Sequence, residues 1–442
     1  MIFKKQSLHP ALDRENKYPC WGIILVLALN LLTPFVSPYL PYLAMVLCVL
    51  RVIRYDERVF ATDYSILITV AMLFRTTGGM SLLIYLCLFA DVWYFIRRGI
   101  RGEAPVVLVV LLANYLLLRM QMNFADFALC FGQLFLLRIL LPEQDAHSAK
   151  RTIKAFSLAL ILTSIYALIF RENSRIVAIR GTEAPAFFGS SIIRFYGLFK
   201  DPNYFSLLLI TSVAGMMKLK DSKAIGWPFF LVGSGLLIVF GILTISKTFF
   251  LMLLLLIVLY LVWQFWNKKI LRGVFMTGGV ALAVAALLLS DNSPFATVLD
   301  RITSATNLDE LTTGRSDVFG AYLSAITENV WTILFGLGLG ASRLGLDPHN
   351  LYIEITYYLG LVGLGLMVAY YCTLIHAINF RHKDYGRQSM IAKYLPLFMV
   401  VMVHMPLHGM TTFPTYMAFF VAALSMLVVK EPQGTTEELS HG

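Results

Sequence analysis

The chain has 442 residues, of which 58% are hydrophobic and only 14% are charged, and its mean hydropathy is +0.73. Soluble domains are nearer half apolar and a quarter charged, so this composition excludes a soluble globular protein and indicates one that crosses a membrane many times. The net charge of +10 does not indicate a nucleic-acid-binding protein, because the basic residues lie in short loops between apolar segments and not on one soluble module.

The apolar segments predict an all-α integral membrane protein with 12–14 transmembrane helices, since a spanning helix needs about 20 mostly apolar residues. The first segment follows a charged leader and has no small-residue cleavage site, so we expect a retained helix and not a removed signal peptide. Only Pro34 and Pro38 separate the first two segments. The candidate spans are 20–35, 37–53, 61–75, 80–97, 104–119, 124–142, 155–170, 202–217, 226–245, 248–266, 273–290, 351–376, 390–409 and 412–429.

Charge predicts the orientation of these spans. If the N-terminus is cytoplasmic and the segments alternate, 24 of the 36 Lys and Arg residues lie in inner segments and 11 in outer ones, with Arg138 inside a span. Every inner loop is then basic, as the positive-inside rule requires, and both termini are cytoplasmic. The predicted parts are an N-terminal bundle (1–170), a first extracytoplasmic loop (171–201), central helices (202–290), a large extracytoplasmic loop (291–350), C-terminal helices (351–430) and a cytoplasmic tail (431–442).

The cysteines predict neither a disulfide framework nor a zinc site. All of them lie in or beside apolar segments, none has the spacing of metal ligands, and small buried apolar residues are their expected role. No Asp-x-Asp motif or histidine-rich set indicates another metal. The cysteines are Cys20, Cys48, Cys87, Cys130 and Cys372.

The outer cations gather in two loops, because eight of the 11 lie in 171–200 and 291–350. The positive-inside rule does not explain why cations would cluster in outer loops. An anionic ligand held by arginine and lysine is the simplest explanation. The alternative is that these charges are solvated and paired with acidic residues of the same loops, which are Glu172, Glu183, Asp309, Glu310 and Asp317.

The first of these loops ends in a segment of cations and aromatic rings, residues 194–203. Such rings suit the headgroup level of a membrane, and they also suit the apolar face of a sugar. Asp201 followed by Pro202 is typical of a helix start, where the carboxylate caps and proline occupies the first turn. Helix capping is therefore the alternative role for Asp201 and Asn203.

Three cations in or near the first outer loop and the central spans are candidates for binding the anionic ligand. Arg180 and Arg194 belong to the first loop, and Tyr196 and Asn203 beside them are further candidates for substrate binding. Lys247 lies in an outer connection so short that the side chain is held at the membrane edge. The alternative for Lys247 is a lysine that extends from a helix end toward the headgroups.

The large outer loop holds the arginine that we rank highest, Arg315, and a further substrate-binding candidate, Arg301. Arginine matches a pyrophosphate because its planar fork makes two parallel charge-assisted hydrogen bonds. A helical pattern follows over 317–335. The run from Gly336 to Gly340 lacks the strand and lysine of nucleotide-binding loops, so we expect a turn that allows close backbone approach.

The same loop closes on His349 and Asn350, which precede a long apolar helix predicted to begin at Leu351. The positive end of that helix dipole favours anions. His349 is therefore a candidate either for a general base or for a phosphate contact, and the alternative is an interfacial histidine bonded to backbone. Glu354 lies four residues after Asn350 and would share its helical face.

These segments, in this order and topology, resemble the O-antigen ligase and Wzy O-antigen polymerase superfamily of bacterial membrane glycosyltransferases. The resemblance covers about residues 190–370, and the N-terminal half matches only as a series of spans. Family members usually have arginine where this chain has Lys247, which keeps the cation but loses the fork. The matching residues are Arg194–Gly197 with Asp201, Pro202 and Asn203; Leu243–Lys247; Gly314 and Arg315; Gly336, Gly338 and Gly340; and His349 and Asn350 before a helix with Gly360 and Gly363.

The resemblance implies a GT-C-like fold with short helices in the large extracytoplasmic loop, in the bacterial cytoplasmic (inner) membrane. It implies a metal-independent, inverting glycosyltransferase without a cofactor, whose donor is a glycan on undecaprenyl pyrophosphate. Its acceptor is another lipid-linked glycan in a polymerase of O-antigen, capsule or exopolysaccharide, and lipid A core in a ligase. Membrane lipid and a chain-length regulator protein are further expected partners. The catalytic residues would be Arg194, Arg315 and His349.

We favour the polymerase over the ligase because the aromatic segment 194–203 resembles capsule and exopolysaccharide polymerases. A different class of protein, a lipid-linked oligosaccharide flippase or transporter, is the second alternative. A transporter predicts charges along a central path and two related halves. The outer cations and the single large loop do not fit that pattern.

Overall fold

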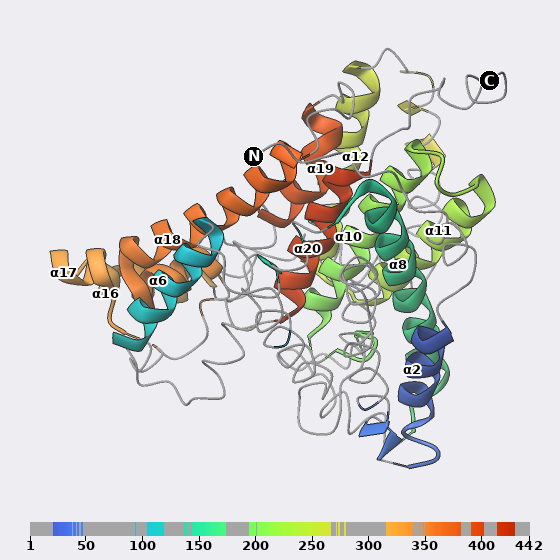
Figure 1. Cartoon of the computed structure of the whole chain (residues 1–442), viewed down its shortest axis with the longest axis horizontal. Coiled ribbons are helices and arrows are strands. Elements are labelled where there is room, and N and C mark those ends of the chain that lie inside the picture. The colour runs from blue at the N-terminus through green and yellow to red at the C-terminus, as the bar shows by residue number, and fades with distance from the viewer. Residues whose placement is uncertain are drawn as a thin grey trace.

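The structure, a computed structural model, is helical, with no strand among the residues that it describes (Figure 1). The described residues are 21–37, 39, 40, 42, 43, 46, 93, 104–118, 137, 138, 141, 144–173, 194–199, 201–266, 271, 273, 274, 278, 279, 315–338, 344, 348, 350–381, 390–401 and 413–428. Their helices are α2 (Trp21–Leu32), α6 (Ala104–Leu118), α8 (Ala146–Ile169), α10 (Pro202–Asp221), α11 (Trp227–Leu243), α12 (Lys247–Trp266), α16 (Arg315–Ile326), α17 (Val330–Phe335), α18 (Leu351–Arg381), α19 (Met390–Met399) and α20 (Phe413–Leu427).

Helix α10 is the centre of the larger group of helices, where it packs against α8, α11, α12, α19 and α20. Most of its residues are buried. Its small and hydroxyl-bearing residues explain this position, because they let neighbouring backbones approach closely inside a membrane. Ser212 Oγ lies 3.3 Å from Ser157 Oγ of α8, and a Cβ added to Gly215 would lie only 2.8 Å from a methyl carbon of Ile153.

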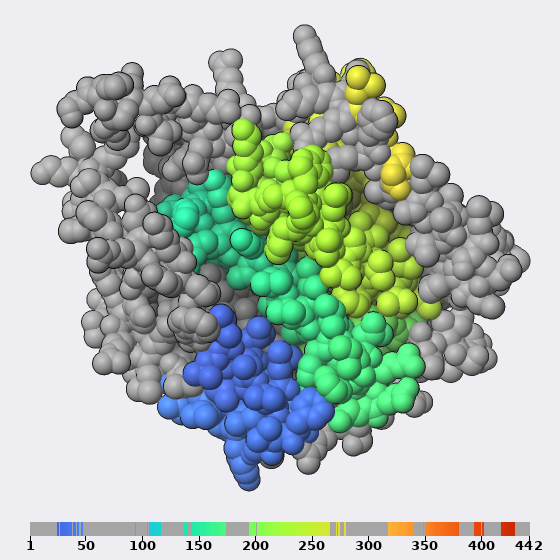
Figure 2. Space-filling view, turned by 90° about the vertical axis from the view of Figure 1, so that its right-hand side faces the viewer, coloured from blue at the N-terminus to red at the C-terminus, as the bar shows by residue number. Residues whose placement is uncertain are grey.

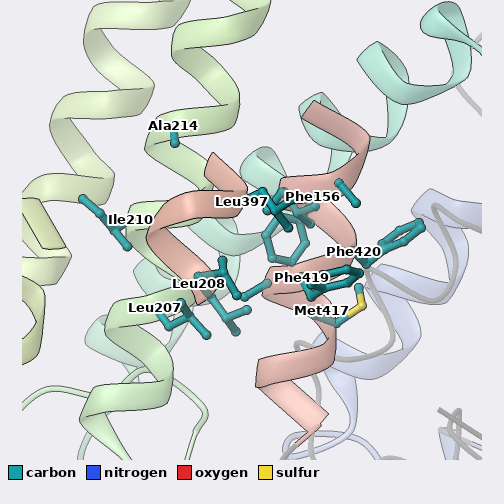
Figure 3. Packing of buried hydrophobic residues seen from close by; sticks show 14 of the residues in the cluster. Phe156, Leu207, Leu208, Ile210, Ala214, Leu397, Met417, Phe419 and Phe420 are labelled. Atoms are coloured by element: carbon teal, nitrogen blue, oxygen red, sulfur yellow. The ribbon is translucent and has the colours of Figure 1, made fainter. Parts of the chain in front are cut away.

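The buried core lies where α8, α10, α19 and α20 meet (Figure 3). Phe156 of α8, Leu208 of α10, Leu397 of α19 and Phe419 of α20 are all buried there. Residues 417–428, which include most of α20, are buried on every side. A helix that is apolar all round is expected in such a position.

Helix α2 lies against α8 at the edge of this group. The Tyr166 hydroxyl donates a hydrogen bond to Leu31 O at 2.8 Å, and the ring centroid of Phe35 lies 6.1 Å from that of Tyr166 and 4.8 Å from that of Phe170. Figure 2 shows the surfaces of α2, α8 and α11 adjoining on one face of the molecule. These contacts place the end of α2 and the turn after it beside α8.

Helix α18 connects the central group to a second one, formed by α6, α16 and α17 on the left of Figure 1. The predicted start at Leu351 is confirmed. The helix is interrupted at Gly360, whose φ of 66° is not helical, and the sequence analysis did not anticipate this break. Beyond the break α18 reaches α20, where the ring centroids of Tyr371 and Phe419 lie 4.4 Å apart.

Three described helices are long and apolar enough to cross a membrane, namely Ala146–Ile169, Lys247–Phe265 and Leu351–Asn379. Large apolar side chains such as Leu231, Val232 and Leu254 are more than half exposed, at 59%, 63% and 59%. Contiguous exposed apolar surface is rare on soluble monomers, and helices that contact lipid account for it. The predictions of an all-α fold and of membrane-spanning helices are confirmed in this coarser form.

Two predicted helical segments differ clearly from the observed helices. The span expected over 155–170 belongs to a helix that begins at Ala146, because Asp145 accepts a hydrogen bond from Ser148 N (2.6 Å) and starts α8 in polar sequence that hydropathy does not detect. The helical pattern over 317–335 forms two helices, because Asn329 accepts from Thr332 N (2.9 Å) and caps α17. The predicted spans 37–53, 61–75, 80–97, 124–142 and 273–290 fall largely outside the described residues, as does the tail 431–442.

Candidate functional site

The candidate site lies at one end of the central bundle, where α10 begins, α11 ends and α12 begins. Helix α10 starts as the sequence predicts, with Asp201 as its N-cap and Pro202 in the first turn. Asp201 Oδ1 accepts from Asn203 N at 2.6 Å and from Tyr204 N at 3.4 Å. The capping role of this carboxylate is therefore confirmed, and it satisfies backbone donors that a helix start leaves unpaired.

The segment before Asp201 lies against the turn between α11 and α12. Phe195 N donates to Leu243 O at 3.0 Å, and Arg194 Nε donates to Thr244 O at 2.9 Å. Tyr196 is buried at 3% exposure. Gly197 has a φ of 58°, and a Cβ there would lie 2.9 Å from the ring of Phe205, so both the backbone conformation and the close ring favour glycine.

Thr244 is the centre of a hydroxyl network that fixes the turn. Its Oγ1 donates to Gly241 O at 2.6 Å, lies 2.9 Å from Ser206 Oγ of α10, and accepts from Ser246 N at 3.3 Å. Thr244, Ser206 and Ser246 are all fully buried. Buried hydroxyls that have partners hold a single geometry firmly, so the carbonyl that accepts from Arg194 is held in place.

The predicted residues Asn203 and Lys247 meet at this turn through Ser246. The Ser246 hydroxyl donates to Asn203 Oδ1 at 2.6 Å and accepts from Phe249 N at 3.4 Å, so it also caps α12. Lys247 is the next residue and the first of α12, and it is half-buried. The cation thus begins the helix that Ser246 ties to α10.

The turn itself is held in an uncommon backbone conformation. Ile245 has a φ of 49°, in the left-handed region that β-branched residues avoid, and it is buried at 6% exposure. Strain of this kind costs about 1–3 kcal/mol and persists where the surroundings determine the backbone. The bonds of Thr244 and Ser246 on either side supply that constraint.

Electrostatically, this end of the bundle is suited to an anion. The N-terminus of α12 lies there and carries a partial positive charge, whereas the carboxylate of Asp201 already occupies the N-terminus of α10. Lys247 adds a full positive charge at a helix start, where a cation lowers helix stability, and no acidic residue lies in the first turn of α12.

The predicted close-approach turn is found at Gly336 and Gly338, which pair with the broken part of α18. Leu337 N donates to Tyr357 O at 2.8 Å, and Gly338 N donates to Tyr358 O at 2.9 Å. A Cβ on Gly336 would lie 2.4 Å from a backbone carbon of Tyr358. Only glycine therefore fits this crossing, as the sequence analysis expected.

The break at Gly360 completes the same crossing. A Cβ on Gly360 would lie 2.3 Å from the backbone of Leu334. The Tyr115 hydroxyl of α6 lies 2.8 Å from Phe335 O and 2.9 Å from Leu359 O, so it bonds both crossing chains. The crossing fixes how α17 and the start of α18 lie relative to each other.

Asn350 is the N-cap of α18. Its Oδ1 accepts from Tyr352 N at 3.0 Å and from Ile353 N at 3.1 Å, and its carbonyl accepts from Glu354 N at 2.9 Å. Pro348 and Glu354 are buried, with Glu354 at 3% exposure. Because the side-chain oxygen of Asn350 is engaged in capping, only its NH2 group is available to donate a hydrogen bond to a ligand.

The structure thus brings Arg194, Asn203 and Lys247 to one turn, while Tyr196 is buried two residues after Arg194. The predicted residues Arg180, Arg301 and His349 lie outside the described residues, and Arg315 begins α16 without a described side chain. The functional assignments of all the site residues stay predictions. Among the described residues, no group of three or more acidic, histidine and cysteine side chains is placed to hold a metal ion.

Sequence reasoning missed the hydroxyl residues that hold the site together, Thr244, Ser246 and Ser206. The signal for Ser246 was its position directly before Lys247, at a helix start where serine commonly caps. Nothing in the local sequence distinguishes Ser206 from the other hydroxyl residues of α10. No protein-family model matches the chain, and no curated protein sequence matches it either.

Proposed function

We propose that this chain is a membrane glycosyltransferase that polymerises oligosaccharide repeat units carried on undecaprenyl pyrophosphate. The observation that carries the proposal is the joining of two cationic segments at one turn. Arg194 bonds the carbonyl of Thr244, and Lys247 follows three residues later at the start of α12. A site for an acidic leaving group needs fixed positive charges of this kind, and the sequence resemblance supplies the identity of the leaving group.

Arg194 is suited to a pyrophosphate because its guanidinium is oriented by the chain. The Nε bond to Thr244 O fixes the plane of the group, and its two terminal nitrogens form the fork that matches two phosphate oxygens. Lys247 contributes a point charge, and the N-terminus of α12 contributes backbone N–H donors. Donors fixed before the reaction stabilise charge as it develops, at no cost of reorganisation.

The reaction is one displacement at the anomeric carbon of the donor sugar. A hydroxyl oxygen of the acceptor glycan forms a bond to that carbon while the bond to the pyrophosphate oxygen breaks, with inversion. The electron pair leaves with the undecaprenyl pyrophosphate, and the hydroxyl proton passes to a base, for which we propose His349. Arg194, Lys247 and Arg315 stabilise the leaving pyrophosphate, and Arg180, Arg301, Asn203, Asn350 and Tyr196 bind the substrates.

We place the protein in the bacterial cytoplasmic membrane, with 12–14 spans and with the site on the extracytoplasmic side. This orientation rests on the basic residues of the inner loops. The donor and the acceptor are then both lipid-linked and meet at the outer leaflet. A chain-length regulator protein is the expected partner in the same membrane.

The proposal is tested by incubating the purified full-length protein, reconstituted in vesicles, with lipid-linked repeat units and separating the products by size. A ladder of longer glycans supports the polymerase. Transfer to lipid A core in a parallel incubation supports the ligase instead, and movement across the bilayer with no new bond supports a flippase. Either of these last two results overturns the proposal.

Variants test the site in the same assay. Arg194→Ala should lower the rate of chain growth about 100-fold or more, as loss of a preorganised donor does. Arg315→Ala and His349→Ala should each abolish product while the protein still inserts into the membrane. Arg171→Ala is the matched control, because Arg171 is exposed and paired with the neighbouring Glu172. Normal long-chain glycan in both Arg315→Ala and His349→Ala would refute the site.

A further inference from the structure

A pocket lies at the opposite end of the bundle from the candidate site. It is lined by the end of α10, the start of α11 and the last turns of α12, and its lining includes Lys220, Asp221, Trp227 and Gln264. The 20 residues of α10, at about 1.5 Å per residue, place it roughly 30 Å from Asp201. The proposed glycosyl transfer does not use it.

The polar groups of this pocket carry both signs of charge and an unused acceptor. Gln264 is buried at 4% exposure, and its Oε1 has no hydrogen-bond partner. Asp221 ends α10 and adds a carboxylate, which also acts on the buried Lys218 one turn earlier. Lys220 Nζ lies 4.3 Å from the centroid of the Trp227 ring. A buried acceptor without a donor is costly, so a ligand that donates is favoured here.

The volume of the pocket limits the size of the donor group that it can hold. Its cavity volume is about 20 Å³, which is enough for one group the size of a water molecule. A primary ammonium group has that size and carries three donors. A trimethylammonium group is larger and has no donor at all. The neighbouring rings of Tyr260 and Trp263, whose centroids lie 5.6 Å apart, also favour a cation.

An apolar groove of about 270 Å³ adjoins the pocket and shares Gln264 with it. The groove is lined by Leu261, Val262 and Phe265 of α12 and by Gly273 and Val274 after it. Phe265 and Val274 are mostly exposed, at 68% and 57%. A ligand that fills both spaces joins a small cationic headgroup to a hydrocarbon chain.

We propose that the pocket and the groove together bind one molecule of phosphatidylethanolamine. Its ammonium group donates to Gln264 Oε1 and faces Asp221, its phosphate lies toward Lys220, and one acyl chain occupies the groove. Opposite charges in the headgroup thus meet opposite charges in the protein. The basic inner segments that end α10 and follow α12 place this lipid in the cytoplasmic leaflet.

The test measures lipid binding to the full-length protein in detergent, by native mass spectrometry and by the midpoint of thermal unfolding. The probes share their acyl chains and carry ethanolamine, N-methylethanolamine, N,N-dimethylethanolamine, choline or glycerol in the headgroup. Phosphatidylethanolamine should bind at least about tenfold more tightly than phosphatidylcholine, with affinity falling at each added methyl group. Equal affinity across the series would overturn the proposal.

Two further outcomes would also overturn it. Tighter binding of phosphatidylglycerol than of phosphatidylethanolamine would mean that Lys220 only attracts anionic lipid. If soluble glycerophosphoethanolamine competed as strongly as the lipid does, the acyl chain in the groove would contribute nothing to binding. The expected result is that the soluble headgroup competes at least about tenfold more weakly, because it buries no hydrocarbon.

Variants identify the atoms. Gln264→Met keeps the length of the side chain and removes the acceptor, so the preference for phosphatidylethanolamine over phosphatidylcholine should disappear. Asp221→Asn, at a half-buried helix end, should weaken that preference several-fold and serves if the first variant does not fold. Asp317→Asn, an exposed acidic residue of α16, is the matched control and should leave it unchanged. A preference that survives both pocket variants would overturn the assignment of the ammonium site.

Discussion

The Ser246 hydroxyl donates a hydrogen bond to Asn203 Oδ1 over 2.6 Å, although 43 residues separate them in the chain. This bond ties the first turn of α12 to the first turn of α10. Lys247 follows Ser246, and Arg194 bonds the carbonyl of Thr244 in the same turn. The placement of Arg194 and Lys247 therefore depends on a few uncharged hydroxyl and amide groups.

The first prediction concerns this bond. Ser246→Ala should lower chain growth about tenfold, because a lost hydrogen bond worth roughly 1.4 kcal/mol no longer positions the turn. Asn203→Ala should have a similar effect, and the double variant should lose less than the sum of the two, because both variants remove this bond while Ser246→Ala also removes the cap of α12. The measurement is the rate of glycan extension with purified protein, together with the unfolding midpoint.

Ser222→Ala is the control for that experiment. Its hydroxyl also makes a hydrogen bond, to Leu219 O at 3.0 Å, but it lies at the far end of α10. Chain growth by this variant should match that of the unaltered protein. Fully additive losses in Ser246→Ala and Asn203→Ala would show that the two residues act separately.

The second prediction separates function from stability at Lys247. Lys247→Met should reduce chain growth about 100-fold, yet it should leave the unfolding midpoint unchanged or slightly higher, because a cation at a helix N-terminus opposes the helix dipole. Lys247→Arg keeps the charge and should be tolerated. A structural lysine would show the reverse pattern, with a lower midpoint and intact chain growth.

Local sequence was sufficient to predict helices wherever apolar length and a cap coincide. Asp201 and Pro202 predict the start of α10 to the residue, and Leu351 predicts the start of α18. The predicted start of α12 is one residue late, at 248 instead of Lys247. These features are local, because an N-cap acts within one turn and a spanning helix is recognised by its length.

The partners of these residues could not be predicted. Arg194 donates a hydrogen bond to a backbone carbonyl 50 residues away. Ser206 of α10 is hydrogen-bonded to Thr244 at the end of α11. Which helices become neighbours depends on packing of the whole bundle, and no local pattern encodes it. The break at Gly360 was missed for the same reason, because its cause is the backbone of Leu334 in another helix.

The third prediction concerns the tyrosine that bonds both chains of the glycine crossing. Tyr115→Phe removes the hydroxyl that lies 2.8 Å from Phe335 O and 2.9 Å from Leu359 O. The free energy of unfolding should fall by about 1–3 kcal/mol, because two partly buried carbonyls lose the single hydroxyl proton that they share. Tyr42→Phe, at an exposed tyrosine, is the control. Equal unfolding midpoints for the two variants would mean that Tyr115 does not stabilise the crossing.

The last prediction tests the crossing itself by adding a single methyl group. Gly360→Ala and Gly336→Ala place a Cβ 2.3–2.4 Å from the backbone of the other chain, at positive φ in both cases. Backbone atoms cannot move aside as a flexible side chain can, so each variant should lose at least about 2 kcal/mol of stability and accumulate poorly in the membrane.

Gly365→Ala provides the comparison, since nothing lies within 4 Å of its added Cβ and the same helix contains it. That variant should be as stable as the unaltered protein or more so, because alanine favours a helix over glycine by about 1 kcal/mol. The measured quantities are the unfolding midpoint and the amount of folded protein in the membrane. If Gly360→Ala and Gly365→Ala behave alike, α17 and α18 do not need to approach so closely, and the start of α18 that carries Asn350 is not fixed by this crossing.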